Sequence, residues 1–143
     1  MSALREGYRL ETDLARFDLA LMHRTLSASY WADGLTRERM DRAINHSLCV
    51  AAFHGAAQVG FARAVSDWAH FAWIADVFVL PDHGGKGLAR AMVAHFHHHP
   101  ELAGVRRFLL VTRDAEGVYE KLGYGVPDDL SWFRQLRPES AWQ

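Results

Sequence analysis

The chain has 143 residues and is 50% hydrophobic, which suffices for one domain with a single buried core. Its formal net charge of −1 favours neither nucleic acid nor an anionic membrane as a partner. A single cysteine, Cys49, excludes a disulfide framework within the chain and is typical of a reducing compartment. No apolar run reaches about eighteen residues, and the start of the chain does not read as a signal peptide. We therefore expect one cytoplasmic domain over residues 1–143, with no membrane partner.

The first part of the chain predicts one strand and two helices. Residues 8–12 alternate between apolar and polar side chains, as a strand with one buried face does. Apolar residues then recur at helical spacing over residues 17–27, and residues 30–34 read as a loop. Thr36 is a suitable N-cap for a second helix. The apolar stripe of that helix consists of Met40, Ala43 and Ile44.

The middle of the chain predicts a hairpin followed by a central strand. Residues 48–53 and 59–65 are strand-like and are joined by a turn at His54 and Gly55. Residues 71–80 are nearly all apolar, which is expected of a strand covered on both faces.

The last part of the chain adds two helices and two strands. A helix from Leu88 should stop at Pro100, and residues 107–112 form a buried strand. Asp114 can cap a short helix that ends at Gly123, and residues 131–136 are expected to form a last strand. The order β-α-α-β-β-β-α-β-α-β departs from strict βαβ alternation and indicates a mixed α/β sheet.

The turn between the central strand and the next helix is rich in glycine, with Gly84, Gly85 and Gly87 close together. Such a turn, followed by a helix N-terminus, presents N–H groups that can hold a pyrophosphate without a metal. It is not a P-loop, because Lys86 is followed by glycine rather than by Ser or Thr. It is not a dinucleotide fingerprint either, because Arg90 stands where the third glycine would be.

Two blocks of this sequence resemble the GNAT superfamily of N-acetyltransferases. Val79-Leu80-Pro81 and Gly87-Leu88-Ala89 match the strand end and the second half of its acetyl-CoA loop, R/Q-x-x-G-x-G/A. Gly84 replaces the usual Arg or Gln. Downstream, Ala115 and the run from Val118 to Tyr124 resemble the family's N-x-x-A-x-x-L-Y-E-K-L-G-F helix, with Val118 in place of the usual Leu and Tyr124 in place of the usual Phe.

The resemblance implies a GNAT-like acyl-CoA N-acyltransferase fold in which two central strands splay apart to admit the pantetheine arm of acetyl-CoA. Backbone groups of the central strand would pair with the pantetheine, and N–H groups of the glycine turn would bind the pyrophosphate. The implied donor-binding residues are Val77, Phe78, Val79, Gly84, Gly85, Lys86, Gly87, Leu88, Ala89 and Thr112, the last in place of the family's Asn.

The resemblance also implies a general acid. Tyr119 occupies the family position whose hydroxyl lies near the thioester sulfur, and an ordinary pKa of about 10 keeps it protonated at neutral pH. The alternative is a half-buried core tyrosine with its hydroxyl turned to solvent.

The base that removes a proton from the amine has several candidates. Asp76 is an acid inside an apolar run, and a buried carboxylate of raised pKa could accept the proton. Asp76 could equally be a structural acid paired with an arginine or a backbone N–H. His70 and Asp67 precede the same strand, and a chain of ordered waters could replace any side chain.

Aromatic residues could form the walls of the acceptor pocket. Tyr30 and Trp31 fall on the loop that in this superfamily usually folds over the acceptor, and Trp73 lies on the central strand. Their rings could hold a cationic amine, or they could simply cover the core.

The histidines at positions 95, 97, 98 and 99 do not predict a metal site. No Cys or acid at ligand spacing completes a four-coordinate zinc site, and imidazoles are favoured at a helix C-terminus.

We expect an enzyme that transfers acetyl from acetyl-CoA to a primary amine of a small molecule or a peptide by direct attack. A catalytically silent acyl-CoA sensor or interaction module is the alternative from another class, and transfer of a longer acyl group is a further one. A homodimer is compatible with the sequence.

Overall fold

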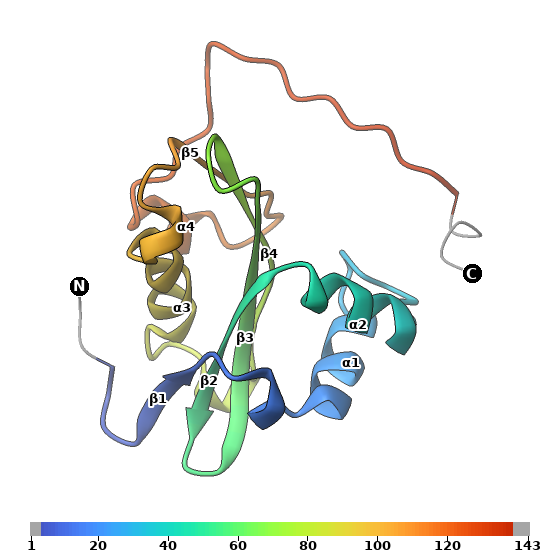
Figure 1. Ribbon diagram of the computed structural model, residues 1–143, viewed down its shortest axis with the longest axis vertical. Coiled ribbons are helices and arrows are strands. Elements are labelled where there is room, and N and C mark those ends of the chain that lie inside the picture. The colour runs from blue at the N-terminus through green and yellow to red at the C-terminus, as the bar shows by residue number, and fades with distance from the viewer. Residues whose placement is uncertain (1–3, 139–143) are drawn as a thin grey trace.

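The computed structural model describes residues 4–138, whose strands form one five-stranded mixed sheet (Figure 1). Its helices and strands are β1 (Tyr8–Glu11), α1 (Leu19–Ser27), α2 (Arg37–Asn45), β2 (Leu48–His54), β3 (Ala57–Ser66), β4 (Phe71–Val79), α3 (Leu88–His97), β5 (Arg107–Leu109) and α4 (Glu116–Glu120). Three short 3-10 helices join them: η1 (Leu14–Arg16), η2 (Pro81–His83) and η3 (Pro100–Leu102).

The strands lie in the sheet in the order in which they follow one another in the sequence. Neighbours from β1 to β4 are antiparallel, and β5 is parallel to β4 because α3 carries the chain back across the sheet. The mixed α/β sheet predicted from the sequence is therefore confirmed.

The two faces of the sheet bury separate cores. On one face, β2 to β4 pack against α3 and Tyr119 of α4, with Met92 and Phe96 of α3 fully buried. On the other face they pack against α1 and α2, where Met22 and Met40 are buried. Alternation along β2 explains the division, since Val50 belongs to the first core and Ala51 to the second.

A β-bulge interrupts this alternation in β4. The register against β3 shifts between Phe61 and Arg63, and Asp76 adopts a left-handed backbone with φ of 55°. Residues four apart in a regular strand face the same side. Here Ile74 belongs to the α3 core and Phe78 to the α1/α2 core. The bulge lies at Asp76, the one acid in β4. Beyond it, side chains that would have faced α3 in a regular strand face α1 and α2 instead.

Capping residues account for the start of α1, the start of α2 and the turn after α4. Thr36 accepts a hydrogen bond from the N–H of Arg39, as expected of an N-cap. Asp18, which the sequence analysis overlooked, caps α1 by accepting from the N–H of Leu21. Gly123 follows α4 with φ of 93°, the left-handed conformation that favours glycine.

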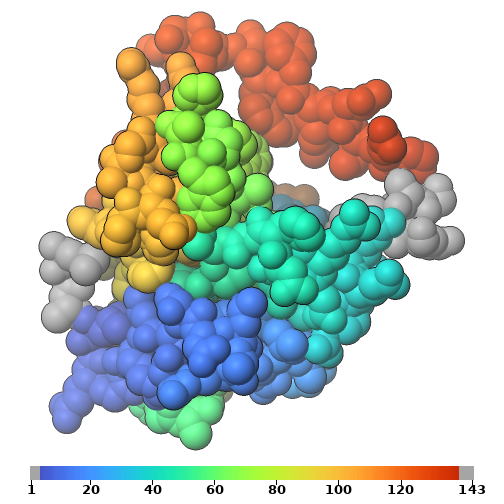
Figure 2. Space-filling view, viewed as in Figure 1, coloured from blue at the N-terminus to red at the C-terminus, as the bar shows by residue number. Residues whose placement is uncertain are grey.

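The predicted end of the chain is wrong in three respects. The expected strand over 107–112 is β5, which ends at Leu109, and Asp114 does not cap α4, whose N-cap is Ala115. The expected strand over 131–136 does not form: the segment extends away from the sheet, and its apolar side chains are exposed (Figures 1 and 2). A strand needs a neighbour to satisfy its backbone, and no described strand lies beside it.

No helix within residues 4–138 is both long and apolar enough to cross a membrane.

Candidate functional site

The candidate site begins where β4 and β5 part. These strands pair only from Phe71, opposite Arg107, to Trp73, opposite Leu109, whereas β4 continues to Val79. Among the described residues no strand covers the β5 side of Val77–Val79. The backbone on that side is open to a ligand that pairs with it as an added strand would. The predicted divergence of two central strands is thus present.

The glycine turn lies at the end of this open strand. Gly85 and Gly87 have φ of 73° and 77°, and Gly87 is the N-cap of α3 with no side-chain capping bond. Within the described chain no hydrogen bond occupies the N–H groups of Gly85, Lys86 and Gly87. The first N–H groups of α3 are unpaired by helix geometry, and the helix dipole is positive at that end. The turn therefore fits a phosphate group.

Gly84 differs from its neighbours in the turn. Its N–H donates to Pro81 O at 3.2 Å, closing η2, so the expectation that it binds a phosphate is corrected. Its φ is −68°, and an added Cβ would lie 3.4 Å from that same oxygen, an ordinary contact. Nothing in the backbone requires glycine here, so the departure from the family's Arg or Gln is not forced by geometry.

Tyr119 lies on α4 with its ring in the core that α3 covers. The residue is 9% exposed, and its ring meets that of Tyr124 edge-on at 5.9 Å. Within residues 4–138 no hydrogen bond joins a protein group to its hydroxyl, and no buried side-chain oxygen or nitrogen there lacks a partner, so this hydroxyl reaches the surface. Burial, with a smaller contribution from nearby Tyr30, raises the pKa of Tyr119 above its ordinary value. The hydroxyl thus stays protonated over the neutral and mildly alkaline range.

Thr112 supports the helix that carries Tyr119. Its hydroxyl accepts a hydrogen bond from the N–H of Ala115 at 3.2 Å, at the start of α4. This contact orients the helix, while the expected contact of Thr112 with the acetyl donor stays a prediction.

The loop between α1 and α2 ties the other elements to this region. Tyr30 accepts a hydrogen bond from the N–H of Arg113 at 3.0 Å, and the Arg113 guanidinium stacks 3.9 Å from the centre of its ring. Trp31 donates from Nε1 to Asp76 at 2.9 Å. The loop therefore connects the bulge of β4 with the segment that leads into α4, and it brings Trp31 against Asp76. The expected role of Tyr30 and Trp31 as acceptor walls stays a prediction.

Asp76 is held in an ion pair. Arg63 donates from Nε to Asp76 at 2.6 Å, and the side chains are 18% and 11% exposed respectively. Arg63 also donates to Ser47 Oγ at 3.1 Å. Of the two roles considered for Asp76, pairing with an arginine is present in the structure, and the role of base stays a prediction. Sequence reasoning missed Arg63, although a lone cation inside the apolar β3 implies a charged partner.

Trp73 does not join the Tyr30–Trp31 cluster. It is half-buried at the last position where β4 pairs with β5, opposite Val65 of β3 and Leu109 of β5. Within residues 4–138 no ring contact or hydrogen bond joins it to Trp31. Its role as an acceptor wall stays a prediction.

In the turn before β4, the carboxylate of Asp67 is bound by backbone N–H groups of the turn itself. Asp67 accepts hydrogen bonds from the N–H groups of Ala69, His70 and Phe71, which lower the pKa of its carboxyl. Asp67 therefore stabilises the turn.

The histidines near the end of α3 bind protein atoms. His97 is 2.7 Å from the hydroxyl of Tyr124, His98 lies 2.8 Å from Ala94 O, and His99 accepts from the N–H of Glu101. In the part of the chain that the structure describes, no group of three or more potential metal ligands gathers.

Comparisons with known proteins show which family and which solved structures this chain is similar to. The model of the acetyltransferase (GNAT) family matches residues 17–124. A candidate acetyltransferase of Gibberella zeae is 26% identical over 140 residues, covering 82% of this chain and 78% of that protein. The crystal structure of a candidate GNAT acetyltransferase from Xanthomonas campestris pv. campestris is 42% identical, with a TM-score of 0.82, and the match covers 90% of this chain and 93% of the other.

A more distant structure has the same fold. A predicted acetyltransferase from Clostridium acetobutylicum, crystallised with acetyl-CoA, is 18% identical with a TM-score of 0.62, over 89% of this chain and 94% of the other. At that identity the likeness concerns the fold alone. Together with the family match, these structures confirm the fold expected from the two sequence blocks.

The ion pair at the bulge should be energetically coupled. We expect the double-mutant cycle of Asp76→Asn and Arg63→Gln to give a coupling free energy of about 1–3 kcal/mol in urea unfolding, because both side chains are largely desolvated. Asn keeps an oxygen for Trp31, so that bond is retained. The control pair is Arg37 and Asp41 on α2, 2.9 Å apart but 46% and 41% exposed, for which about 0.3–0.5 kcal/mol is expected. Equal coupling in both pairs would contradict the assignment.

Proposed function

We propose that this chain, which belongs to the GNAT family of acetyltransferases, transfers an acetyl group from acetyl-CoA to a primary amine by direct attack of the amine on the thioester. The observation that carries the proposal is the open side of β4. It leads from the free N–H groups of the glycine turn towards the bulge at Asp76, where Trp31 is bound.

The donor site fits a ligand with a pyrophosphate and an amide-containing arm. We assign the pyrophosphate to the N–H groups of Gly85, Lys86, Gly87, Leu88 and Ala89, since the first three are unpaired and the last two begin α3. The open backbone of Val77–Val79 would pair with the amides of the arm. Bound there, acetyl-CoA supplies an activated acyl group and a thiolate leaving group.

Two proton transfers accompany the reaction. The amine nitrogen forms a bond to the acetyl carbonyl carbon, and the carbon–sulfur bond breaks. We assign to Tyr119 the proton that the departing thiolate takes up, since its hydroxyl is protonated and no hydrogen bond to a described residue occupies it. Asp76 accepts the proton that the attacking amine loses, directly or through an ordered water. Each of its oxygens already accepts one hydrogen bond, which leaves lone-pair capacity on both.

The acceptor side is built from aromatic rings. Tyr30 and Trp31 are each 44% exposed, and their rings meet edge-on at 5.1 Å. Exposed aromatic faces beside a carboxylate suit a cationic amine of a small molecule or a peptide.

A catalytically silent acyl-CoA-binding module is the second candidate. It is favoured by Gly84, which lacks the side chain that the family usually places there, and by the ion pair that already neutralises Asp76. Turnover with a panel of primary amines separates the two functions, because only the enzyme releases free CoA.

The left-handed glycine of the turn should matter for donor binding. Alanine at Gly87, where φ is 77°, costs roughly 1–2 kcal/mol of backbone strain, so we expect acetyl-CoA to bind about tenfold more weakly by calorimetry. Gly84→Ala is the control: its φ of −68° suits any residue, and its affinity should stay within about twofold of the parent's. EDTA should change neither value. Equal affinities for both variants would refute the assignment of the turn.

The hydroxyl of Tyr119 should act in turnover and not in binding. Tyr119→Phe keeps the packed ring, so we expect an unchanged affinity for acetyl-CoA and a fall in kcat on the order of 10²–10⁴. A CoA thiol titrating near the cysteine value of about 8.5 leaves unaided as thiolate at high pH. The defect in kcat should therefore shrink as the pH rises past that value.

Tyr124→Phe is the matched control for Tyr119→Phe. Its ring is also partly buried, but its hydroxyl is bonded to His97 at 2.7 Å. We expect a small loss of stability and a parental kcat. If both variants turn over like the parent, Tyr119 is not the acid.

A further inference from the structure

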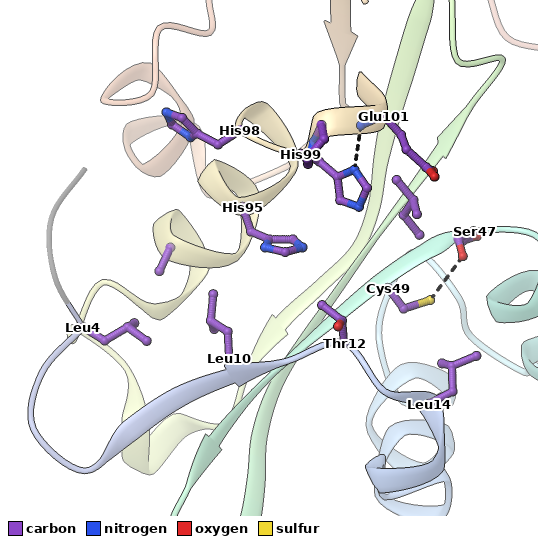
Figure 3. Close-up of a pocket in the computed structure, with 13 residues that line it drawn as sticks. Leu4, Leu10, Thr12, Leu14, Ser47, Cys49, His95, His98, His99 and Glu101 are labelled. Atoms are coloured by element: carbon purple, nitrogen blue, oxygen red, sulfur yellow. Dashed lines mark hydrogen bonds between the residues drawn. The ribbon is translucent and has the colours of Figure 1, made fainter. Parts of the chain in front are cut away.

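A second opening lies on the α3 side of the sheet, where β1 and β2 part. β1 pairs with β2 only as far as Glu11, opposite Ala51, so Leu48–Val50 extend past the end of β1. The end of α3 and η3 face this gap, and the cavity between them has a volume of about 710 Å³ (Figure 3). That volume is typical of a small-molecule site. None of the residues assigned to the donor or the acceptor lines it.

The cavity has an apolar body. It is lined by Leu4, Leu10, Leu14, Leu48, Ala91 and Pro100. These side chains come from the N-terminal segment, from β2 and from α3 with η3, so they enclose the cavity from more than one direction (Figure 3). A ligand that fills the cavity therefore needs an apolar part.

The polar side of the cavity is suited to a positive charge. Glu101 lines it, and its carboxylate has no ion-pair partner among the described residues. No lysine or arginine is among the residues found to line the cavity. The carbonyl end of α3, where the helix dipole is negative, lies at the same place.

The histidines that line the cavity add no positive charge that would oppose the binding of a cation. Burial, together with His99, lowers the pKa of His95, so its imidazole is neutral at pH 7. His99 accepts from the N–H of Glu101 through Nδ1, which leaves Nε2 as its donor. Arg63 reaches Ser47 of the wall, but its charge is paired with Asp76.

We propose that the cavity between β1, β2 and the end of α3 binds an apolar amine, with its ammonium group at Glu101 and its hydrocarbon part against the leucines. This site is separate from the reacting centre, and its occupation does not require the transferase activity.

The test compares three probes of equal shape with the full chain, without acetyl-CoA, at pH 7.5. These are 2-phenylethylamine, which is a cation, the neutral 2-phenylethanol and the anionic phenylacetate. We expect calorimetry to show the amine binding at least about tenfold more tightly than the alcohol, as a charge-assisted hydrogen bond provides. Phenylacetate should not bind. Amide resonances of residues 10–14 and 95–101 should shift on adding the amine.

Three variants assign the binding to this cavity. Glu101→Gln should abolish the preference for the amine and leave the affinity for the alcohol unchanged. Glu38→Gln, at a carboxylate on α2 that is exposed like that of Glu101 but lies outside the cavity, is the control and should keep the parental preference. Leu14→Trp adds bulk to the cavity wall at a residue that is 37% exposed, and it should weaken the binding of both the amine and the alcohol.

The proposal is overturned if the amine and the alcohol bind equally, or if Glu101→Gln keeps the preference. It is also overturned if the amine shifts only the resonances of residues 30, 31, 76 and 119. That last result would leave the proposed acceptor site intact, so the two proposals fail separately.

Discussion

The left-handed backbone of Asp76 forms a bulge in β4 that exchanges the faces to which the side chains after it point. The arrangement of the rest of the site depends on this bulge. Asp76 adopts φ of 55°, a conformation that costs an ordinary residue energy but that Asp tolerates better than most. The ion pair with Arg63 and the hydrogen bond from Trp31 hold it there. Because the bulge is held from two sides, Phe78 fills the α1/α2 core while Val77 and Val79 pack towards α3.

The same constraint connects structural elements that lie far apart in the sequence. Arg63, which pairs with Asp76, also donates a hydrogen bond to Ser47 just before β2. Trp31 donates to Asp76 from the loop between α1 and α2. Tyr30 of that loop reaches Arg113, which precedes α4 and Tyr119. Polar contacts from Ser47 to Trp31, the edge-on contact of Trp31 with Tyr30, and the hydrogen bond to Tyr30 thus connect these elements through the bulge. Loops held in this way need little reordering when a substrate binds, which reduces the entropy lost on binding.

The sequence predicted the parts of this arrangement that depend on local pattern. Thr36 as N-cap, the glycine turn, the helices and the mixed sheet all follow from spacing and from residue type. The resemblance added the donor loop and Tyr119. The bulge was not predicted, because periodicity over an almost wholly apolar strand does not reveal a change of face. Arg63 and its partner are far apart in sequence, so only the fold brings them together.

The end of the chain shows where local pattern misleads. Residues 131–136 have the composition of a strand, but a strand exists only where another strand accepts its hydrogen bonds. In the same way, the N–H of Gly84 was expected to bind the phosphate, but it donates to Pro81 O and so closes the 3-10 helix η2 at the start of the glycine turn. Both cases depend on which partner a backbone group finds, and composition does not determine that.

The central claim is that the open side of β4 and the glycine turn together hold acetyl-CoA. Amide hydrogen exchange with and without saturating acetyl-CoA tests it most directly. The account predicts slower exchange at residues 77–79 and 85–89, and unchanged exchange at residues 47–49 and 95–101. Protection of the second set of residues without the first would contradict it.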